Sequence, residues 1–156
     1  MPGGASYFQM HEQDMRRIMQ HHCCMIGSDG LPHDSLPHPR LWGTFPRVLG
    51  RYARELKALS LEAAVHKMTG LSAATYCLGE RGLIAVGMKA DITVFNPETI
   101  IDRATYEAPA QLAEGIVHVF VNGTLAWTEK AATSVRSGRF LTRHSAAREN
   151  PRESRR

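Results

Sequence analysis

The sequence lacks the features that mark membrane, secreted and zinc-cluster proteins. No run of 18 apolar residues occurs in its 156 residues, and its opening residues have neither the basic nor the apolar region of a signal peptide. It also has no His-x-His pair and no Cys-x-x-Cys pair to complete a zinc set. We therefore expect a soluble globular protein that is not exported.

Cysteine and aromatic residues are also scarce. Cys23 and Cys24 are adjacent and cannot easily form a disulfide with each other, and Cys77 is the odd third cysteine. Such an odd, unspaced set of thiols indicates a reducing, cytoplasmic compartment. Aromatic residues make up 7% of the chain and do not interleave with a block of Lys or Arg. Half of the net charge of +4 lies in the last thirteen residues, which leaves little excess positive charge on the rest of the chain. The charge therefore does not favour nucleic acid or a membrane as a partner.

The length allows one ordinary hydrophobic core but not a complete (β/α)₈ barrel, which needs ~250 residues. In the first part, residues 12–20 have apolar residues at helical spacing and predict a short helix. The unbroken apolar run 23–26 predicts a strand buried on both faces, and residues 5–10 a second short strand. Strand, helix and strand would make a βαβ unit of a parallel sheet.

Four prolines between residues 31 and 46 predict an ordered loop and not a helix. Helical spacing then returns over residues 47–57. Ser60 is the predicted N-cap of a helix over 61–68 that Gly70 ends, and a third short helix is expected between Ser72 and Gly79.

After Gly79 the pattern becomes that of β-structure. Strands are predicted over 90–95, 115–121, 124–128 and 138–141, and Asn122-Gly123 predicts a type I′ hairpin turn. Residues 97–114 are expected to be an irregular connection, and the Arg-, Glu- and Ser-rich tail 144–156 to be disordered. Each part has too few strands to complete a sheet or sandwich, so the chain is expected to be the end of something larger.

Asp29 is the strongest candidate for chemistry. It directly follows the predicted buried strand, and the carboxyl edge of a parallel sheet is where α/β folds collect their reactive groups. There a carboxylate can accept a proton from metal-bound water. The alternative is ordinary turn chemistry, because Ser-Asp-Gly is a common turn sequence.

The loop 32–40 holds the second set of candidates: His33, His38 and Arg40, with an Asp between the histidines. These side chains could bind a metal, and Arg40 could hold a carboxylate in bidentate fashion. The prolines and the His-x₄-His spacing favour a rigid loop that lines a pocket instead. Elsewhere, His21 and His22 could cap a helix, His118 is expected to be a satisfied sheet residue, and the adjacent thiols to pack as small apolar groups.

Two stretches resemble a known family. They are MIGSDGLPHD at residues 25–34 and HPRLWGTFPRVLG at residues 38–50, with ADITVF at 90–95 and VNG at 121–123 further on. The sequence over about residues 7–143 is similar to the D-aminoacylase group, the N-acyl-D-amino-acid deacylases of the amidohydrolase superfamily.

The resemblance implies an α/β fold: residues 1–79 the last βα units of a metal-dependent TIM barrel, 80–143 part of a small β-sandwich, and 144–156 a basic tail. It implies a zinc-dependent hydrolase that cleaves the amide of an N-acyl-D-amino acid into a carboxylate and a D-amino acid. Asp29 matches the aspartate that takes the proton from water and passes it to the leaving nitrogen. Arg40, with His33 and His38 in its loop, is expected to bind the substrate.

The family's zinc ligands lie on barrel strands that this chain does not contain. We therefore expect that the chain alone binds no catalytic zinc and hydrolyses nothing, and that it is a fragment or one piece of a split enzyme whose partner supplies the rest of the barrel. A non-catalytic interaction module derived from an amidohydrolase, or an amidohydrolase of cyclic amides, remains an alternative.

Overall fold

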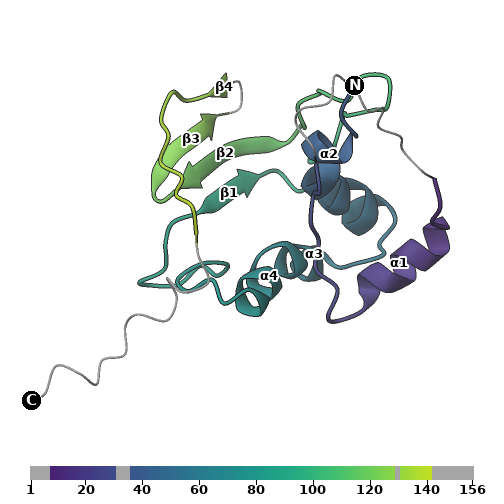
Figure 1. Cartoon of the computed structure of the whole chain (residues 1–156), viewed down its shortest axis with the longest axis horizontal. Helices are drawn as coiled ribbons and strands as arrows, with labels where there is room; N and C mark the ends of the chain where they lie inside the picture. The colour runs from purple at the N-terminus through teal and green to yellow at the C-terminus, as the bar shows by residue number, and fades with distance from the viewer. Residues whose placement is uncertain (1–7, 31–35, 129–130, 142–156) are drawn as a thin grey trace, which may run out of the picture.

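The computed structural model describes residues 8–30, 36–128 and 131–141. Helices occupy the first half of the chain and a small sheet the second (Figure 1). No helix in these three segments is both long and apolar enough to cross a membrane. The helices are α1 (Glu12–Gln20), α2 (Arg40–Arg47), the π-helix η1 (Val48–Glu55), α3 (Leu61–Met68) and α4 (Gly70–Thr75). The strands are β1 (Ile92–Phe95), β2 (Ile116–Val121), β3 (Thr124–Thr128) and β4 (Ala131–Ala132).

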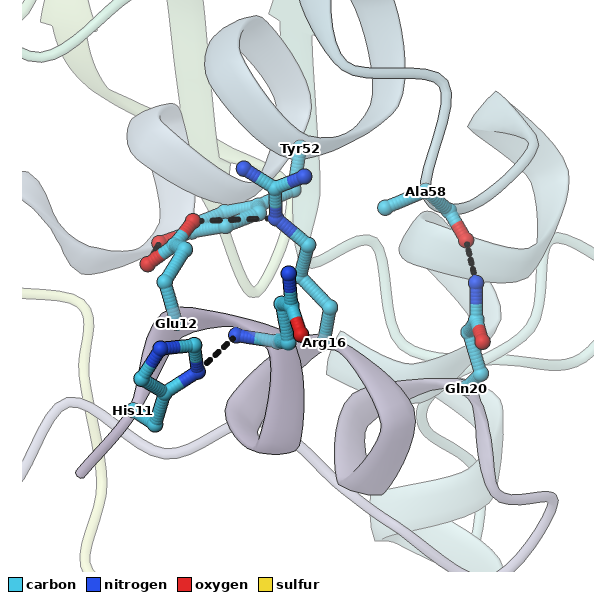
Figure 2. Close-up of polar contacts among 7 residues, drawn as sticks. His11, Glu12, Arg16, Gln20, Tyr52 and Ala58 are labelled. Carbon is cyan, nitrogen blue, oxygen red and sulfur yellow. Dashed lines mark hydrogen bonds and ion pairs between the residues drawn. The ribbon is translucent and has the colours of Figure 1, made fainter.

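Helix α1 has the predicted bounds and is fixed to the rest of the molecule at both ends (Figure 2). At its start, the Tyr52 hydroxyl of η1 lies 3.5 Å from the Glu12 carboxylate, which also pairs with Arg16 one turn later. At its end, the Gln20 side-chain amide donates to the Ala58 carbonyl at 3.0 Å. The end of α1 is thereby held against the segment that follows η1.

Helix α3 also has the predicted bounds, because its start is determined locally. The Ser60 hydroxyl accepts the Ala63 N–H at 3.1 Å, which is the expected N-cap bond. Gly70 does not end the helical region as predicted. It begins α4, with Thr69 as the residue between the two helices.

The prediction that residues 31–46 form a loop is wrong from Arg40 onward. Pro39 is the N-cap of α2, a position where a ring without an N–H costs no hydrogen bond. Pro46 lies inside the helix near its end, and the π-helix follows it directly. In η1 the Leu56 N–H donates to the Arg51 carbonyl at 2.8 Å, the five-residue spacing of a π-helix.

The buried strand predicted at residues 23–26 is also wrong. These residues form a turn followed by irregular chain, Cys23 is exposed, and the other three are only half-buried. An apolar run signals burial, but a strand also needs a neighbouring strand to bond with. Here the Ile26 N–H donates to the Lys67 carbonyl at the end of α3 instead. Residues 8–10 are not a strand either, and 5–7 lie outside the described residues, so no βαβ unit is present in the described chain.

The sheet is antiparallel, with the strand order β1-β2-β3-β4. Asn122 and Gly123 join β2 to β3 with φ values of 48° and 78°, as the predicted type I′ turn requires. The strand predicted at 138–141 is wrong, because this segment has no ladder among the described residues and the last strand is β4. The expected disordered tail lies outside the described residues.

The core lies among the helices and is closed by the connection between β1 and β2. Ile100 from this connection is 1% exposed, and Arg54 of η1 donates to its carbonyl at 2.7 Å. Gly50 of η1 makes this approach possible, since a Cβ there would lie 2.3 Å from the Ile100 oxygen. The buried apolar residues of this core are Met19, Val48, Leu49, Tyr52, Ala53, Leu59, Ala64 and Ile100.

Candidate functional site

The loop before α2 and the start of α2 bring Asp29 and Arg40 together. Asp29 has a φ of 44°, in the left-handed region that Asp tolerates better than most residues. The Arg40 Nε donates to the Asp29 carbonyl at 2.7 Å, and its Nη2 lies 3.0 Å from Oδ2. Arg40 therefore binds both the backbone and the side chain of Asp29.

Asp29 stays open to solvent in this arrangement. Its side chain is 82% exposed and that of Arg40 is 44% exposed. The guanidinium has five N–H groups, of which the two contacts with Asp29 use two. The pair can therefore present a proton-accepting carboxylate and unused guanidinium donors to the same small molecule.

His38 lies beside this pair and is bonded through both ring nitrogens. Its Nδ1 accepts the Arg40 N–H at 3.0 Å, and its Nε2 lies 3.2 Å from the Tyr106 hydroxyl. Because Nδ1 is an acceptor, the neutral ring carries its proton on Nε2 and donates it to Tyr106.

The surroundings of His38 favour its neutral form. Burial, and after it the Arg40 cation, hold the pKa of His38 below its usual value, while Asp29 acts in the opposite direction. The ring is thus a neutral bridge between the start of α2 and the connection that carries Tyr106.

Tyr106 was missed by sequence reasoning. It lies in the irregular connection, 68 residues from His38, and no local spacing links the two. Its ring packs edge-on to the His38 ring, with centroids 5.2 Å apart, and lies 5.1 Å from the ring of Phe8. His33, the remaining predicted substrate-binding residue, lies outside the described residues.

A groove on the described surface lies elsewhere. It has a volume of about 470 Å³ and is lined by η1, the start of α3 and the Pro97-Glu98 turn. It contains none of Asp29, His38 and Arg40. Among the described residues, Asp29, His38 and Arg40 therefore do not line this groove.

Other histidines and cysteines differ partly from expectation. His118 is not satisfied as expected, because its buried Nδ1 has no partner among the described residues. Cys23 does not pack as a small apolar group, because it is exposed. His21 is the C-cap of α1, and its backbone N–H donates to the Ile18 carbonyl at 3.0 Å.

A metal site at Asp29 is not supported by the donors around it. In the described part of the chain, one group of three His, Cys, Asp or Glu residues has ligand atoms close enough to share an ion, and that group is His21, His22 and Cys23. Asp29 instead has the Arg40 cation as its neighbour. The residues described here do not form a ligand set for an ion at Asp29.

Comparison with known proteins gives a consistent result. The model of the amidohydrolase family matches residues 9–126. An N-acyl-D-glutamate deacylase of Alcaligenes xylosoxydans xylosoxydans is 54% identical over 99% of this chain, which covers 31% of that protein. A D-aminoacylase of the same organism is 55% identical over 93% of this chain, and the match covers 30% of that D-aminoacylase. The chain thus spans less than a third of these relatives.

Solved structures agree with the sequence matches. A D-aminoacylase studied for its binuclear metal centre has a TM-score of 0.81 and 54% identity, over 83% of this chain and 27% of that one. An N-acyl-D-glutamate deacylase from Bordetella bronchiseptica, complexed with zinc and a phosphonate that mimics the tetrahedral intermediate, has a TM-score of 0.76 and 52% identity. That match covers 78% of this chain and 26% of the solved one.

Proposed function

The chain belongs to the amidohydrolase family, and from this premise we propose that it supplies the proton acceptor and part of the substrate site of an N-acyl-D-amino-acid deacylase. The reaction would cleave the amide C–N bond with water and release a carboxylate and a D-amino acid. The observation that carries this proposal is the pairing of an exposed carboxylate, Asp29, with the Arg40 guanidinium, in a chain 54% identical to an N-acyl-D-glutamate deacylase.

Asp29 accepts a proton from the water that attacks the amide carbonyl, and a new C–O bond forms. It then returns this proton to the nitrogen as the C–N bond breaks, so that the amine leaves in neutral form. An exposed carboxylate suits both transfers, because water and substrate can reach it.

Arg40 binds the α-carboxylate of the substrate through the donors that Asp29 leaves unused. Neutral His38 holds the Arg40 backbone N–H, and so orients the first turn of α2 on which Arg40 lies. We propose His33 as a further substrate-binding residue on the resemblance alone. The pair of charges then orients the substrate with its carboxylate on Arg40 and its amide over Asp29.

A catalytic zinc ion needs ligands that the residues around Asp29 do not provide. We propose that these ligands come from sequence outside these 156 residues, in the same polypeptide or in a second one that docks onto it. The relatives described with zinc or a binuclear metal centre support this proposal, since they are more than three times as long as the matched part. The chain alone is then expected to be inactive.

The same premise supports a finer assignment of the fold. Residues 1–79 would be the last βα units of a TIM barrel, 80–143 a portion of a β-sandwich, and 144–156 a basic tail. The exposed thiols of Cys23 and Cys77 support a reducing, cytoplasmic location.

A chimera tests the proposal. In the Alcaligenes D-aminoacylase, the matching segment is replaced by this chain, which is 55% identical to it. The chimera should hydrolyse N-acyl-D-amino acids, and Asp29→Asn should lower kcat by at least about 10²-fold. Asp14→Asn, at an exposed carboxylate of α1, is the matched control and should leave kcat unchanged. A folded chimera whose kcat is the same with Asn at position 29 would overturn the assignment.

A further inference from the structure

Three consecutive side chains with metal-binding atoms meet where α1 ends. The ligand atoms of His21, His22 and Cys23 all lie within 4.8 Å of one another, and all three residues are exposed. The two imidazole rings are tilted by 32° relative to each other, with centroids 4.5 Å apart. None of the three belongs to the Asp29–Arg40 site, so the proposed function leaves them unexplained.

The turn that carries these residues is fixed by its backbone. The Cys24 N–H donates to the His21 carbonyl at 3.0 Å and closes the turn. The Lys67 ammonium donates to the His21 carbonyl at 2.6 Å and to the Cys24 carbonyl at 3.1 Å. Lys67 is 5% exposed, so one buried cation holds both ends of the turn.

Helix α1 gives the turn a second support. Gln20, the residue before the turn, donates from its side chain to the Ala58 carbonyl (Figure 2). The His21 N–H also continues the helix by bonding to the Ile18 carbonyl. Hydrogen bonds therefore fix the backbone that carries the three side chains. In this turn, consecutive residues can place their side chains on the same side of the backbone.

The ligand chemistry is that of zinc and similar ions. Imidazole nitrogen and thiolate sulfur bind Zn²⁺ at about 2.0–2.1 Å and 2.3 Å, which places tetrahedral ligand atoms about 3.3–3.6 Å apart. Because the ligand atoms already lie within 4.8 Å of one another, a shift of at most about an ångström brings them to these values. Exposed side chains can make this shift by small χ rotations, without moving the turn.

We propose that His21, His22 and Cys23 form a three-ligand site for a thiophilic divalent metal ion, with Zn²⁺ as the reference ion. Its fourth position is open to water or to an external ligand. The long hydrogen bond of 3.4 Å from the Cys23 N–H to the His21 Nδ1 orients the first imidazole beside the thiol. Cys24 is not a ligand, since it does not belong to the cluster and its Sγ lies 3.6 Å from the Met25 carbonyl.

Titration of the reduced full chain with Co²⁺ tests the site, because thiolate coordination gives a charge-transfer absorption that imidazole or carboxylate sites lack. One equivalent of Co²⁺ should produce this band, and Zn²⁺ should displace it. Cys23→Ser should abolish the band, and His21→Ala and His22→Ala should each weaken Co²⁺ binding at least about tenfold. All three positions are exposed and the contacts of Lys67 are to backbone, so these variants should keep the circular dichroism of the parent.

Three matched variants serve as controls: Cys24→Ser, Cys77→Ser and His66→Ala. They remove a neighbouring thiol, a remote exposed thiol and a remote exposed imidazole, and each should leave the band and the affinity unchanged. The proposal is overturned if no thiolate band appears with excess Co²⁺. It is also overturned if the band survives Cys23→Ser, or if Cys24→Ser or Cys77→Ser removes it.

Discussion

The side chains of Asp29, Arg40 and His38 interact through their charges, and the pKa of His38 is sensitive to this interaction. Its neutral ring accepts from the Arg40 backbone and contacts the Tyr106 hydroxyl, while the Arg40 side chain pairs with Asp29. Protonation of His38 would place a cation beside the Arg40 guanidinium and convert its Nδ1 from an acceptor to a donor. The hydrogen bond from the Arg40 N–H would then be lost.

We expect the pKa of His38 to lie below its ordinary value of 6.5, because burial and then Arg40 lower it. NMR titration of the ring protons measures this midpoint. Arg40→Gln should raise the midpoint toward 6.5, because it removes the cation that lowers the pKa of His38. Arg16→Gln is the control and should leave the midpoint unchanged, because Arg16 pairs with Glu12 within α1. A midpoint at or above 6.5 in the parent chain would contradict the geometry.

The same shift determines the sign of a pH effect on stability. The folded chain binds the His38 proton less readily than the unfolded chain does. The contribution of His38 to the free energy of unfolding is therefore fully present above pH 6.5 and is lost as the pH falls below it toward the lowered pKa. Replacing His38 by Gln should remove this part of the pH dependence.

At the scale of elements, the packing of η1 against the β1–β2 connection depends on Gly50. Gly→Ala inside a helix ordinarily stabilises by about 0.5–1 kcal/mol. Here the added Cβ would meet the Ile100 carbonyl at 2.3 Å, and a backbone atom cannot rotate away as a side chain can. We expect Gly50→Ala to lower the free energy of unfolding by about 1–3 kcal/mol.

Urea unfolding at one fixed protein concentration measures this effect. Gly27→Ala is the matched control, because a Cβ at Gly27 has nothing within 4 Å. It should change the free energy of unfolding by less than about 0.5 kcal/mol. A Gly50→Ala variant as stable as the parent would show that η1 and the connection are not packed as described.

The elements that sequence predicted correctly are those determined by local chemistry. The Ser60 cap fixes the start of α3, and Asn122-Gly123 fixes the hairpin through two positive φ values. The wrong predictions needed information from distant residues. Whether the run 23–26 is a strand depends on a partner strand, and here the segment bonds to the end of α3 instead.

The candidate site divides in the same way. Asp29 and Arg40 could be found from a short motif, and the structure brings them into contact. Tyr106 could not be found, because only the packing of the connection brings it to His38. The cluster at His21 was missed because consecutive residues rarely point the same way, and the turn that aligns them depends on Lys67, 46 residues away.

At the scale of the whole molecule, much apolar surface remains exposed. Trp42 and Phe45, one turn apart on α2, are each 42% exposed, and Ile84 is 89% exposed. A chain without the rest of a barrel is expected to expose the run 23–26 as well, and here Cys23 is exposed while residues 24–26 are half-buried. Each Å² of apolar surface left in water costs about 25 cal/mol, which favours association through such a face.

We expect the isolated chain to self-associate at micromolar concentration, as measured by sedimentation or by light scattering after gel filtration. Replacing Trp42 and Phe45 together by Ser should reduce this association, because it removes the largest apolar side chains of α2 from the surface. A parent chain that is monomeric and melts sharply at this concentration would contradict the expectation.

We propose that Asp29 is a proton acceptor and that the ligands of the metal it serves lie outside these 156 residues. Hydrolysis of an N-acetyl-D-amino acid by the purified chain, with added Zn²⁺, tests it most directly. We predict no turnover above background, with or without the ion. Turnover by the chain alone that Asp29→Asn abolishes and Asp14→Asn leaves intact would contradict the claim.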